Sequence, residues 1–338
     1  MTFRQLKENE QEKNSWNEFA LSHNFGHLFQ TYDWGEVSRE LGWCPLRLLV
    51  EDKDKILAIA QILKRKKGPF SILYIPRGPI FSNSESFHFL SANLTEVIKR
   101  ENAILCKINP AIDKQTATKE LYEYNSFVKS SFREMHICSY RINLSQDLNN
   151  IWNNFRGSVR TSIRKAEKSG VAVDDSDSAE NLNSFYKIYS DLSVKGKTTT
   201  HSYKFLKAVW ERFIPKKQIK ILTAYFEGRP IATELLFLYS KIGELMWISN
   251  VRLDNDLGAS QLIHWKIINW LKENGFLFYD LGGVPPNKNE LPGIHFHKQS
   301  LGGDFVELAG EFELAGSPLL YFFWSKFGRL YINRNRPK

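Results

Sequence analysis

The sequence predicts an α/β (α+β) protein made of two similar units, each with a mixed, mostly antiparallel sheet flanked by helices. Residues 46–60 and residues 219–233 both read as an apolar strand, a charged turn and a second strand. A third strand, a helix and a fourth strand then follow in each copy. Because the same order occurs twice, about 170 residues apart, we expect a duplicated domain.

The first copy lies in the N-terminal part of the chain. Apolar runs predict strands at 46–50, 56–60 and 70–74, and the charged turn at 51–55 has hairpin chemistry. A helix at 87–99 and a strand at 103–108 complete this copy.

The second copy repeats these elements. Its hairpin turn is Glu227-Gly228, and its third strand spans 244–249. Apolar residues at helical spacing predict a helix over 259–273, which ends in a polar turn before a strand at 276–281.

Helices are expected between the copies. One is predicted over 151–169, with Gly170 as its C-terminal cap. Its buried stripe consists of Trp152, Phe155, Val159, Ile163 and Ala166. Asp177 and Glu180 form a capping pair for the next helix. We expect the tail to pack on the first copy, which gives one domain of residues 1–145 and 311–338 and another of residues 146–310.

Composition limits the partners of this protein. Its 338 residues are 42% hydrophobic and carry a net charge of +9, which suits nucleic acid, nucleotide phosphates or anionic lipid surfaces. Cys44, Cys106 and Cys138 lie far apart, so neither disulfides nor a structural zinc site are expected. The polar N-terminus and the lack of a long apolar run predict a cytoplasmic protein without a signal peptide.

Five cations mark the helix expected over 151–169. They are Arg156, Arg160, Arg164, Lys165 and Lys168. Like charges four residues apart repel each other, so such a helix faces either solvent or an anion. Because arginine outnumbers lysine and suits phosphate geometry, we interpret this basic stripe as a phosphate-binding surface, with a solvated face as the alternative.

The end of the strand at 276–281 is a second candidate site. Asp280-Leu281-Gly282-Gly283 permits either a backbone approach to a ligand or a plain turn. His295 and His297 lie two residues apart, on one face if the segment is extended, but no third ligand has the spacing of a metal site. Lys298, a cation beside glycines, is the more informative residue.

Several catalytic motifs are missing from the sequence. It has no Gly-x-Ser-x-Gly elbow, no Walker loop and no dinucleotide fingerprint. The loop 252–260 leads into a helix N-terminus, where an anion could bind, but Asp254 and Asp256 would repel a pyrophosphate. We therefore expect neither a covalent nucleophile nor a cofactor.

Five short segments follow one another along nearly the whole chain. They read FQTYDW (29–34), YIPRGPI (74–80), RTSIRKAEKSGV (160–171), YDLGG (279–283) and FHKQSLGG (296–303). Together they resemble the Fem family of peptidoglycan-bridge aminoacyltransferases. The chain is similar to the compact members that lack a coiled-coil arm, because it shows no insertion after Ser190.

The resemblance implies two acetyltransferase-like (GNAT) domains. It implies transfer of an amino acid from aminoacyl-tRNA to an amine of a peptidoglycan precursor, lipid-linked or nucleotide-linked, by a monomer with peripheral contact at the inner membrane face. Because the donor is an activated ester, the enzyme must mainly place the reactants and stabilise an oxyanion. That role fits the missing nucleophile.

The same resemblance gives expectations for the site. Lys298 would stabilise a substrate carbonyl or phosphate. Asp280 is a candidate base, with a buried turn-stabilising carboxylate as the alternative. The basic stripe would hold the tRNA acceptor end or precursor phosphates. The substrates are expected to contact Trp34, Glu36, Thr199, His201, Trp247, Gly282, Gly283 and His297.

Three positions depart from the family pattern. Glu36 stands where compact relatives that use a nucleotide-linked precursor have lysine, His201 falls near a phosphate-binding arginine, and Asn109 replaces an acidic residue. The departures favour a lipid-linked precursor or a different amine. Two other functions stay open: a coenzyme A-dependent N-acyltransferase with its donor near Arg252 and Gly258, and a non-catalytic RNA-binding protein.

Overall fold

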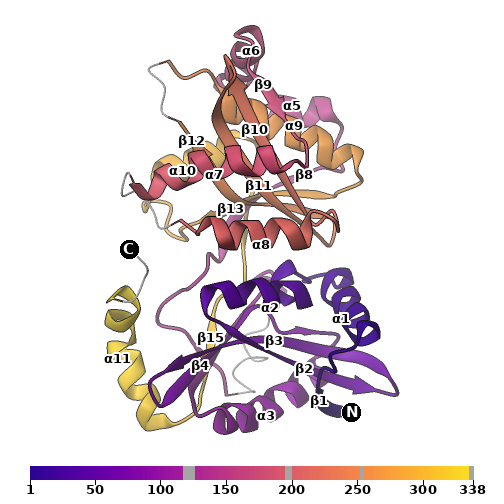
Figure 1. Ribbon diagram of the computed structural model, residues 1–338, viewed down its shortest axis with the longest axis vertical. Coiled ribbons are helices and arrows are strands. Elements are labelled where there is room, and N and C mark those ends of the chain that lie inside the picture. The colour runs from indigo at the N-terminus through magenta and orange to yellow at the C-terminus, as the bar shows by residue number, and fades with distance from the viewer. Residues whose placement is uncertain (117–125, 195–199, 252–254, 335–338) are drawn as a thin grey trace. The chain divides into compact units, whose positions relative to one another are not determined.

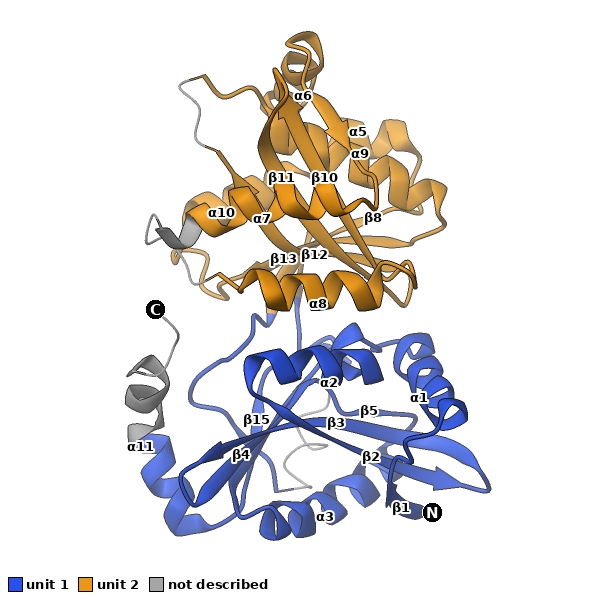
Figure 2. Cartoon of the chain, viewed as in Figure 1, with its two compact units in different colours: residues 1–137, 307–338 blue, residues 138–306 orange. Residues whose placement is uncertain are grey.

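The computed structural model describes residues 1–116, 126–194, 200–251 and 255–334 (Figure 1). They form two compact units, one of residues 1–137 and 307–338 and one of residues 138–306 (Figure 2). Each unit has its own sheet flanked by helices, which confirms the predicted fold class.

The sheet of the first unit is mixed. Its strand order is β1-β2-β3-β4-β6-β15-β7, and β5 pairs with β3. The strands are β1 (Thr2–Gln5), β2 (Cys44–Asp52), β3 (Lys55–Lys67), β4 (Phe70–Arg77), β5 (Ile80–Phe81), β6 (Ala103–Pro110), β7 (Val128–Lys129) and β15 (Phe312–Ala315). Only β4 and β6 are parallel among these described pairs.

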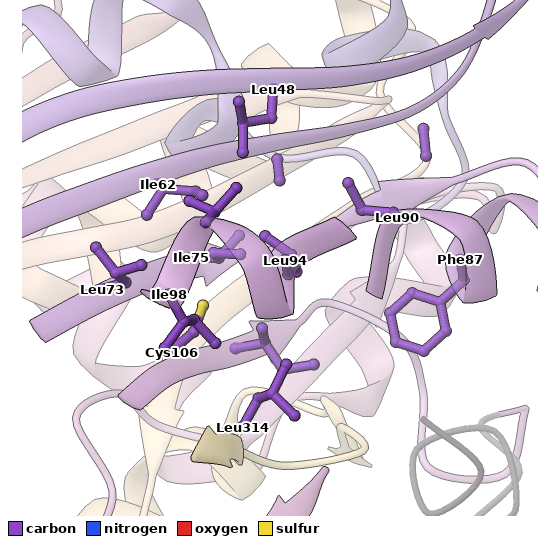
Figure 3. Close-up of a cluster of buried hydrophobic side chains, with 14 of the residues drawn as sticks. Leu48, Ile62, Leu73, Ile75, Phe87, Leu90, Leu94, Ile98, Cys106 and Leu314 are labelled. Carbon is purple, nitrogen blue, oxygen red and sulfur yellow. The ribbon is translucent and has the colours of Figure 1, made fainter. Parts of the chain in front are cut away.

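Different helices cover the two faces of this sheet. They are α1 (Glu10–Ser22), α2 (Tyr32–Ser38) and α3 (Ser84–Arg100); short 3-10 turns at Leu28–Gln30 and Arg39–Leu41 flank α2. Phe87 of α3 belongs to the same buried cluster as Leu48 (Figure 3). Trp16 of α1 packs with Leu49 in another cluster. Successive strand residues point to opposite faces, so β2 supplies both cores.

The second unit has a seven-stranded sheet in the order β14-β8-β13-β12-β11-β10-β9. These strands are β8 (Cys138–Asn143), β9 (Ala172–Asp174), β10 (Ile219–Phe226), β11 (Arg229–Tyr239), β12 (Ile242–Asn250), β13 (Phe278–Val284) and β14 (Asp304–Glu307). Its helices are α5 (Leu148–Asn154), α6 (Gly157–Lys168), α7 (Ala179–Val194), α8 (Tyr203–Phe213), α9 (Ala259–Glu273) and α10 (Pro292–Ser300).

The predicted internal repeat is confirmed. The order β2-β3-β4-α3-β6 in the first unit matches β10-β11-β12-α9-β13 in the second, and each series ends in a parallel pair. Both first hairpins turn through two residues with positive φ: Lys53 (47°) and Asp54 (65°), then Glu227 (50°) and Gly228 (72°). This geometry suits the right-handed twist of paired strands.

The middle region differs from the prediction in two places. The helix expected over 151–169 is divided into α5 and α6, because Arg156 has an extended ψ of 149°. Gly170 does end α6 with a φ of 81°. The N-terminus of α7 is capped by Ser178, whose Oγ accepts from the backbone N–H of Asn181, and not by Asp177.

The predicted domain boundary at residue 145 is wrong. Strand β8 pairs with β13 of the second unit, so the boundary falls at residue 137. The segment with His295 and His297 was considered as a strand, but it forms α10. Within the described residues, no helix is both long and apolar enough to cross a membrane.

A buried ion cluster ties the tail to the first unit. Strand β15 pairs with β6. Lys107 Nζ of β6 lies 3.2 Å from Glu311 Oε2 and 3.4 Å from Glu313 Oε1. It also donates to the carbonyl of Phe132. Asn109, which departs from the family pattern, is fully buried and donates to Glu311.

Candidate active site

The parallel strand pairs of the two units differ in how far they stay paired. In the first unit, β4 pairs with β6 at six positions between Ser71 and Arg77. In the second unit, β12 pairs with β13 at only three positions, Ile242 to Glu244. The structure describes every residue of β12 and β13, so the end of pairing at Glu244 means that the two strands separate there. This point of separation exists in the second unit alone.

Lys298 lies at the end of α10 and reaches the backbone of β13 near this point. Its Nζ donates to the carbonyl oxygens of Gly282 at 2.7 Å and Gly283 at 2.9 Å. Gly282 has a φ of 79°, and a Cβ there would lie 2.5 Å from the carbonyl oxygen of Leu245. Glycine is therefore required at this turn. A lysine ammonium has three N–H donors, so one remains for a substrate atom.

Burial controls the charge of Lys298. Burial lowers the pKa of the ammonium to about 8, although Asp280, Glu244 and Glu234 act in the opposite direction. Because the pKa lies near neutrality, the side chain is mostly cationic at pH 7 and becomes neutral in mildly alkaline solution.

The carboxylate of Asp280 is fully engaged within the second unit. It accepts from Ser139 Oγ at 2.9 Å, from Arg141 Nε at 2.7 Å and from the backbone N–H of Gly282 at 2.9 Å. These contacts favour the structural alternative over a base. Asp280 holds the turn whose carbonyls bind Lys298.

A buried polar group beneath the site was missed in the sequence. Glu234 of β11, His264 of α9 and Tyr279 of β13 meet there: His264 Nδ1 lies 2.8 Å from the Tyr279 hydroxyl and 3.3 Å from Glu234 Oε2. Burial raises the pKa of Glu234 and lowers the pKa of His264. The available signal was one acidic residue in the apolar run 231–239.

A cavity of about 540 Å³ lies at the N-terminal end of α9. Asn250, Asp256, Ser260 and His297 contribute polar atoms to its lining. The His297 ring lies 5.6 Å from the His264 ring, so the cavity adjoins the buried polar group. Burial, together with the charge of Lys298, lowers the pKa of His297. The cavity and Lys298 thus share neighbouring residues.

Trp247 and His201 lie side by side in the second unit. Their ring centroids are 5.3 Å apart, and Trp247 also contacts Phe205 and Phe237. Burial lowers the pKa of His201. Trp247 is half-buried in this aromatic cluster. Three other candidates, Thr199, Arg252 and Asp254, lie outside the described residues.

The basic stripe is only partly available to a ligand. Arg160 Nη1 donates to the carbonyls of Asn153 at 3.0 Å and Phe155 at 2.6 Å, so it caps the end of α5. Only Nη1 is used in these bonds, so part of the guanidinium is committed to the helix end and its role in phosphate binding stays a prediction. Lys165 Nζ donates to the carbonyl of Asp256.

Four cations of the stripe are exposed: Arg156, Arg164, Lys165 and Lys168. The Arg156 guanidinium lies over the Phe296 ring at 4.5 Å, and that of Arg164 lies 5.5 Å from the Trp152 ring centroid. In the described part of the chain, Lys168 makes neither a hydrogen bond nor an ion pair. Because Lys165 already donates to Asp256, the residues most available to an anion are Arg156, Arg164 and Lys168.

Two candidates of the first unit make internal contacts. Trp34 is 7% exposed and packs 4.2 Å from the Phe29 ring, which favours a core role. Glu36 Oε1 lies 2.7 Å from Arg47 Nη2, and Glu36 Oε2 lies 3.0 Å from Arg39 Nε. Burial alone would raise the pKa of Glu36, but these two arginines outweigh it and lower that pKa.

Comparison with known proteins supports the family resemblance. Residues 11–141 match the FemAB family, and residues 153–295 match the Acetyltransferase (GNAT) domain. The crystal structure of FemX superposes with a TM-score of 0.85 over 96% of this chain and 100% of that chain, at 17% identity. These matches support the Fem-family resemblance, although the FemAB model covers less than half of the chain. The chain is a tandem GNAT protein, as the sequence resemblance implied.

A curated relative and a further solved structure also resemble this chain. Lipid II:glycine glycyltransferase of Staphylococcus aureus is 29% identical over 183 residues, which cover 50% of this chain and 43% of that protein. The match thus spans less than half of the curated relative. A tandem GNAT protein from the clavulanic acid biosynthesis pathway shares the fold with a TM-score of 0.59 at 8% identity, over 94% of this chain and 99% of that chain.

Proposed function

We propose that this protein is an aminoacyltransferase of peptidoglycan cross-bridge synthesis. It would move an amino acid from aminoacyl-tRNA to an amine of a peptidoglycan precursor, on the cytoplasmic side of the membrane. The observation that carries the proposal is Lys298, which is held by two backbone carbonyls and has one N–H left. The similarity to a lipid II:glycine glycyltransferase supports the choice of substrates.

The proposed chemistry needs no covalent enzyme intermediate. The acceptor amine attacks the carbonyl carbon of the aminoacyl ester, which forms a C–N bond and a tetrahedral oxyanion. The C–O ester bond then breaks, and the proton lost by the amine ends on the hydroxyl of the released tRNA. The free N–H of Lys298 would donate to the oxyanion, a contact that strengthens as negative charge develops.

The buried group of Glu234, His264 and Tyr279 would influence the charge of Lys298. Glu234 raises the pKa of Lys298 only while it is ionised, and burial raises the pKa of Glu234 itself; Asp280 and Glu244 act on Lys298 in the same direction. Keeping Lys298 cationic at neutral pH is what oxyanion stabilisation requires.

Transfer of labelled amino acids tests the proposal directly. The purified protein is incubated with each aminoacyl-tRNA in turn and with a lipid-linked or a nucleotide-linked precursor, and the label on the precursor is measured. We expect transfer from at least one aminoacyl-tRNA. No transfer from any of them to either precursor form would rule the proposal out.

An acyl-coenzyme A donor is the second candidate, because the cavity lies at the N-terminus of α9, where a pyrophosphate would be favoured. Asp256 counts against it. This aspartate lines the cavity, and its Oδ1 accepts from the backbone N–H of Gly258. Titration calorimetry with acetyl-coenzyme A separates the two donors: saturable binding would favour coenzyme A.

Reversing the charge of Arg164 and Lys168 is expected to weaken tRNA binding. A plot of log affinity against log salt has a negative slope. In the Arg164→Glu/Lys168→Glu variant this slope should become shallower by about 1 for each phosphate contact that is lost. Arg160 is left intact because it caps α5. The measurement is filter binding of tRNA over a salt series.

The control for this variant is Lys99→Glu/Lys207→Glu, which makes the same change in net charge at two other exposed lysines. Equal binding by both variants would show that the stripe has no specific role. A non-catalytic RNA-binding protein would give the same binding result, so only the transfer assay separates that alternative.

A further inference from the structure

The C-terminal helix α11 (Pro318–Arg334) presents an unusual outer face. Its inner face is anchored to the first unit: the Tyr321 hydroxyl donates to Glu313 Oε2 at 2.8 Å, and the Trp324 ring lies 5.9 Å from the Phe132 ring. Residues 321 and 324 are three apart and therefore share one side of the helix. These contacts determine which side of α11 is turned outward.

The outward side is apolar and aromatic. Leu319 is 67% exposed, Phe322 is 50% exposed and Phe323 is 52% exposed. The Phe322 and Phe323 rings lie 5.8 Å apart, and Lys326 Nζ lies 4.3 Å from the Phe322 ring. Contiguous exposed apolar side chains of this size mark an interaction site. We call Leu319, Phe322, Phe323 and Lys326 the α11 patch.

The charge of the surrounding segment indicates what the α11 patch contacts. Residues 318–338 contain no aspartate or glutamate. Their five cations are Lys326, Arg329, Arg334, Arg336 and Lys338. A segment that combines phenylalanine, tyrosine and tryptophan with lysine and arginine is typical of helices that lie in the plane of a membrane interface.

We propose that α11 docks flat on an anionic lipid bilayer through the α11 patch. The phenylalanines would enter the boundary between headgroups and acyl chains, and Lys326 would meet lipid phosphates. Among the described residues no helix can span a bilayer, so the contact is peripheral. The inference deepens the proposed function, on which its purpose rests, because a lipid-linked acceptor is embedded in a bilayer.

Vesicle flotation with the full chain tests the docking without any turnover. The protein is mixed with vesicles of phosphatidylcholine alone or of phosphatidylcholine with phosphatidylglycerol, at low and high salt. We expect binding to the anionic vesicles that weakens as salt rises, because exposed charges are screened. We expect much weaker binding to phosphatidylcholine alone.

Two variants address the two parts of the α11 patch. Phe322→Ser/Phe323→Ser should lower the vesicle affinity by about tenfold or more, because it removes apolar area that would leave water. Lys326→Glu should lower it by about fivefold or more and should reduce the salt dependence. Both leave Tyr321 and Trp324 in place, so the helix keeps its anchor.

Matched controls change similar residues elsewhere. Leu277→Ser removes an apolar side chain that is 46% exposed, and Lys207→Glu reverses an exposed lysine on α8. Both should bind anionic vesicles like the unmodified protein. Circular dichroism and thermal unfolding should show that all four variants are folded.

Three results would overturn the proposal. The first is no binding of the unmodified protein to anionic vesicles, and the second is unchanged binding by Phe322→Ser/Phe323→Ser. The third is a concentration-dependent dimer, seen by light scattering and abolished by that variant, which would make a second copy the occupant of the α11 patch. A failure of the proposed function would give a different result. The protein would still bind anionic vesicles, but the transfer assay would show no amino acid on either precursor.

Discussion

Replacing Lys298 by methionine is expected to lower kcat for aminoacyl transfer by about 100- to 1,000-fold, the effect of losing one oxyanion donor. Methionine keeps much of the side-chain length but cannot donate to the oxyanion. The KM values of both substrates should change far less than kcat, because the donated bond forms fully only in the transition state. Steady-state kinetics of transfer measures both quantities.

The pH profile distinguishes a chemical role of Lys298 from a structural one. Its pKa of about 8 means that the cation is present below pH 8 and is lost as the pH rises through that value. The rate at saturating substrate should therefore fall above pH 8. In Lys298→Arg the guanidinium stays charged, so this alkaline decrease should disappear.

The control for Lys298 is Lys266→Met, which removes an exposed lysine from the same unit. It should keep normal kcat and a normal pH profile. If Lys298→Met had the activity of the unmodified protein, the central assignment would be wrong. Loss of activity together with an unchanged alkaline limb in Lys298→Arg would point to a structural role.

Replacing Lys107 by methionine is expected to have the largest effect on stability. Lys107, Glu311 and Glu313 are each at most 3% exposed, so the change would leave two carboxylates buried without a cation. Breaking a buried ion cluster in this way costs about 3–5 kcal/mol. Urea denaturation followed by tryptophan fluorescence should show the first unit unfolding at a lower concentration.

A second variant makes this prediction sharper. Adding Glu311→Gln and Glu313→Gln to Lys107→Met removes the two buried carboxylate charges that lack a cation, so part of the lost stability should return. The exposed pair Lys99–Glu96 is the matched control, because Lys99→Met should cost less than about 1 kcal/mol. Equal effects of Lys99→Met and Lys107→Met would contradict the role of burial.

Local patterns predicted the fold well. Short hairpins, such as the one through Glu227 and Gly228, depend on turn residues and on apolar residues close in sequence. The duplicated order of strands and helices was visible for the same reason. The break between α5 and α6 was missed, because the apolar stripe continues across it and only the backbone at Phe155 and Arg156 departs from the helix.

The domain boundary needed long-range contacts. Strand β8 looks like a continuation of the first unit in sequence, but its hydrogen bonds go to β13. The cluster of Lys107 with Glu311 and Glu313 joins residues about two hundred positions apart, and no local pattern reports such a pairing.

The sequence by itself determined the two-unit fold, the family resemblance and the choice of Lys298, because each depends on residue types at short spacing. Only the tertiary structure decided what these side chains can do. It showed that Arg160 caps a helix, that three donors occupy Asp280, and that Lys298 has one free N–H. The reason is physical: the availability of a polar group depends on which distant atoms already satisfy it, and folding alone brings those atoms together.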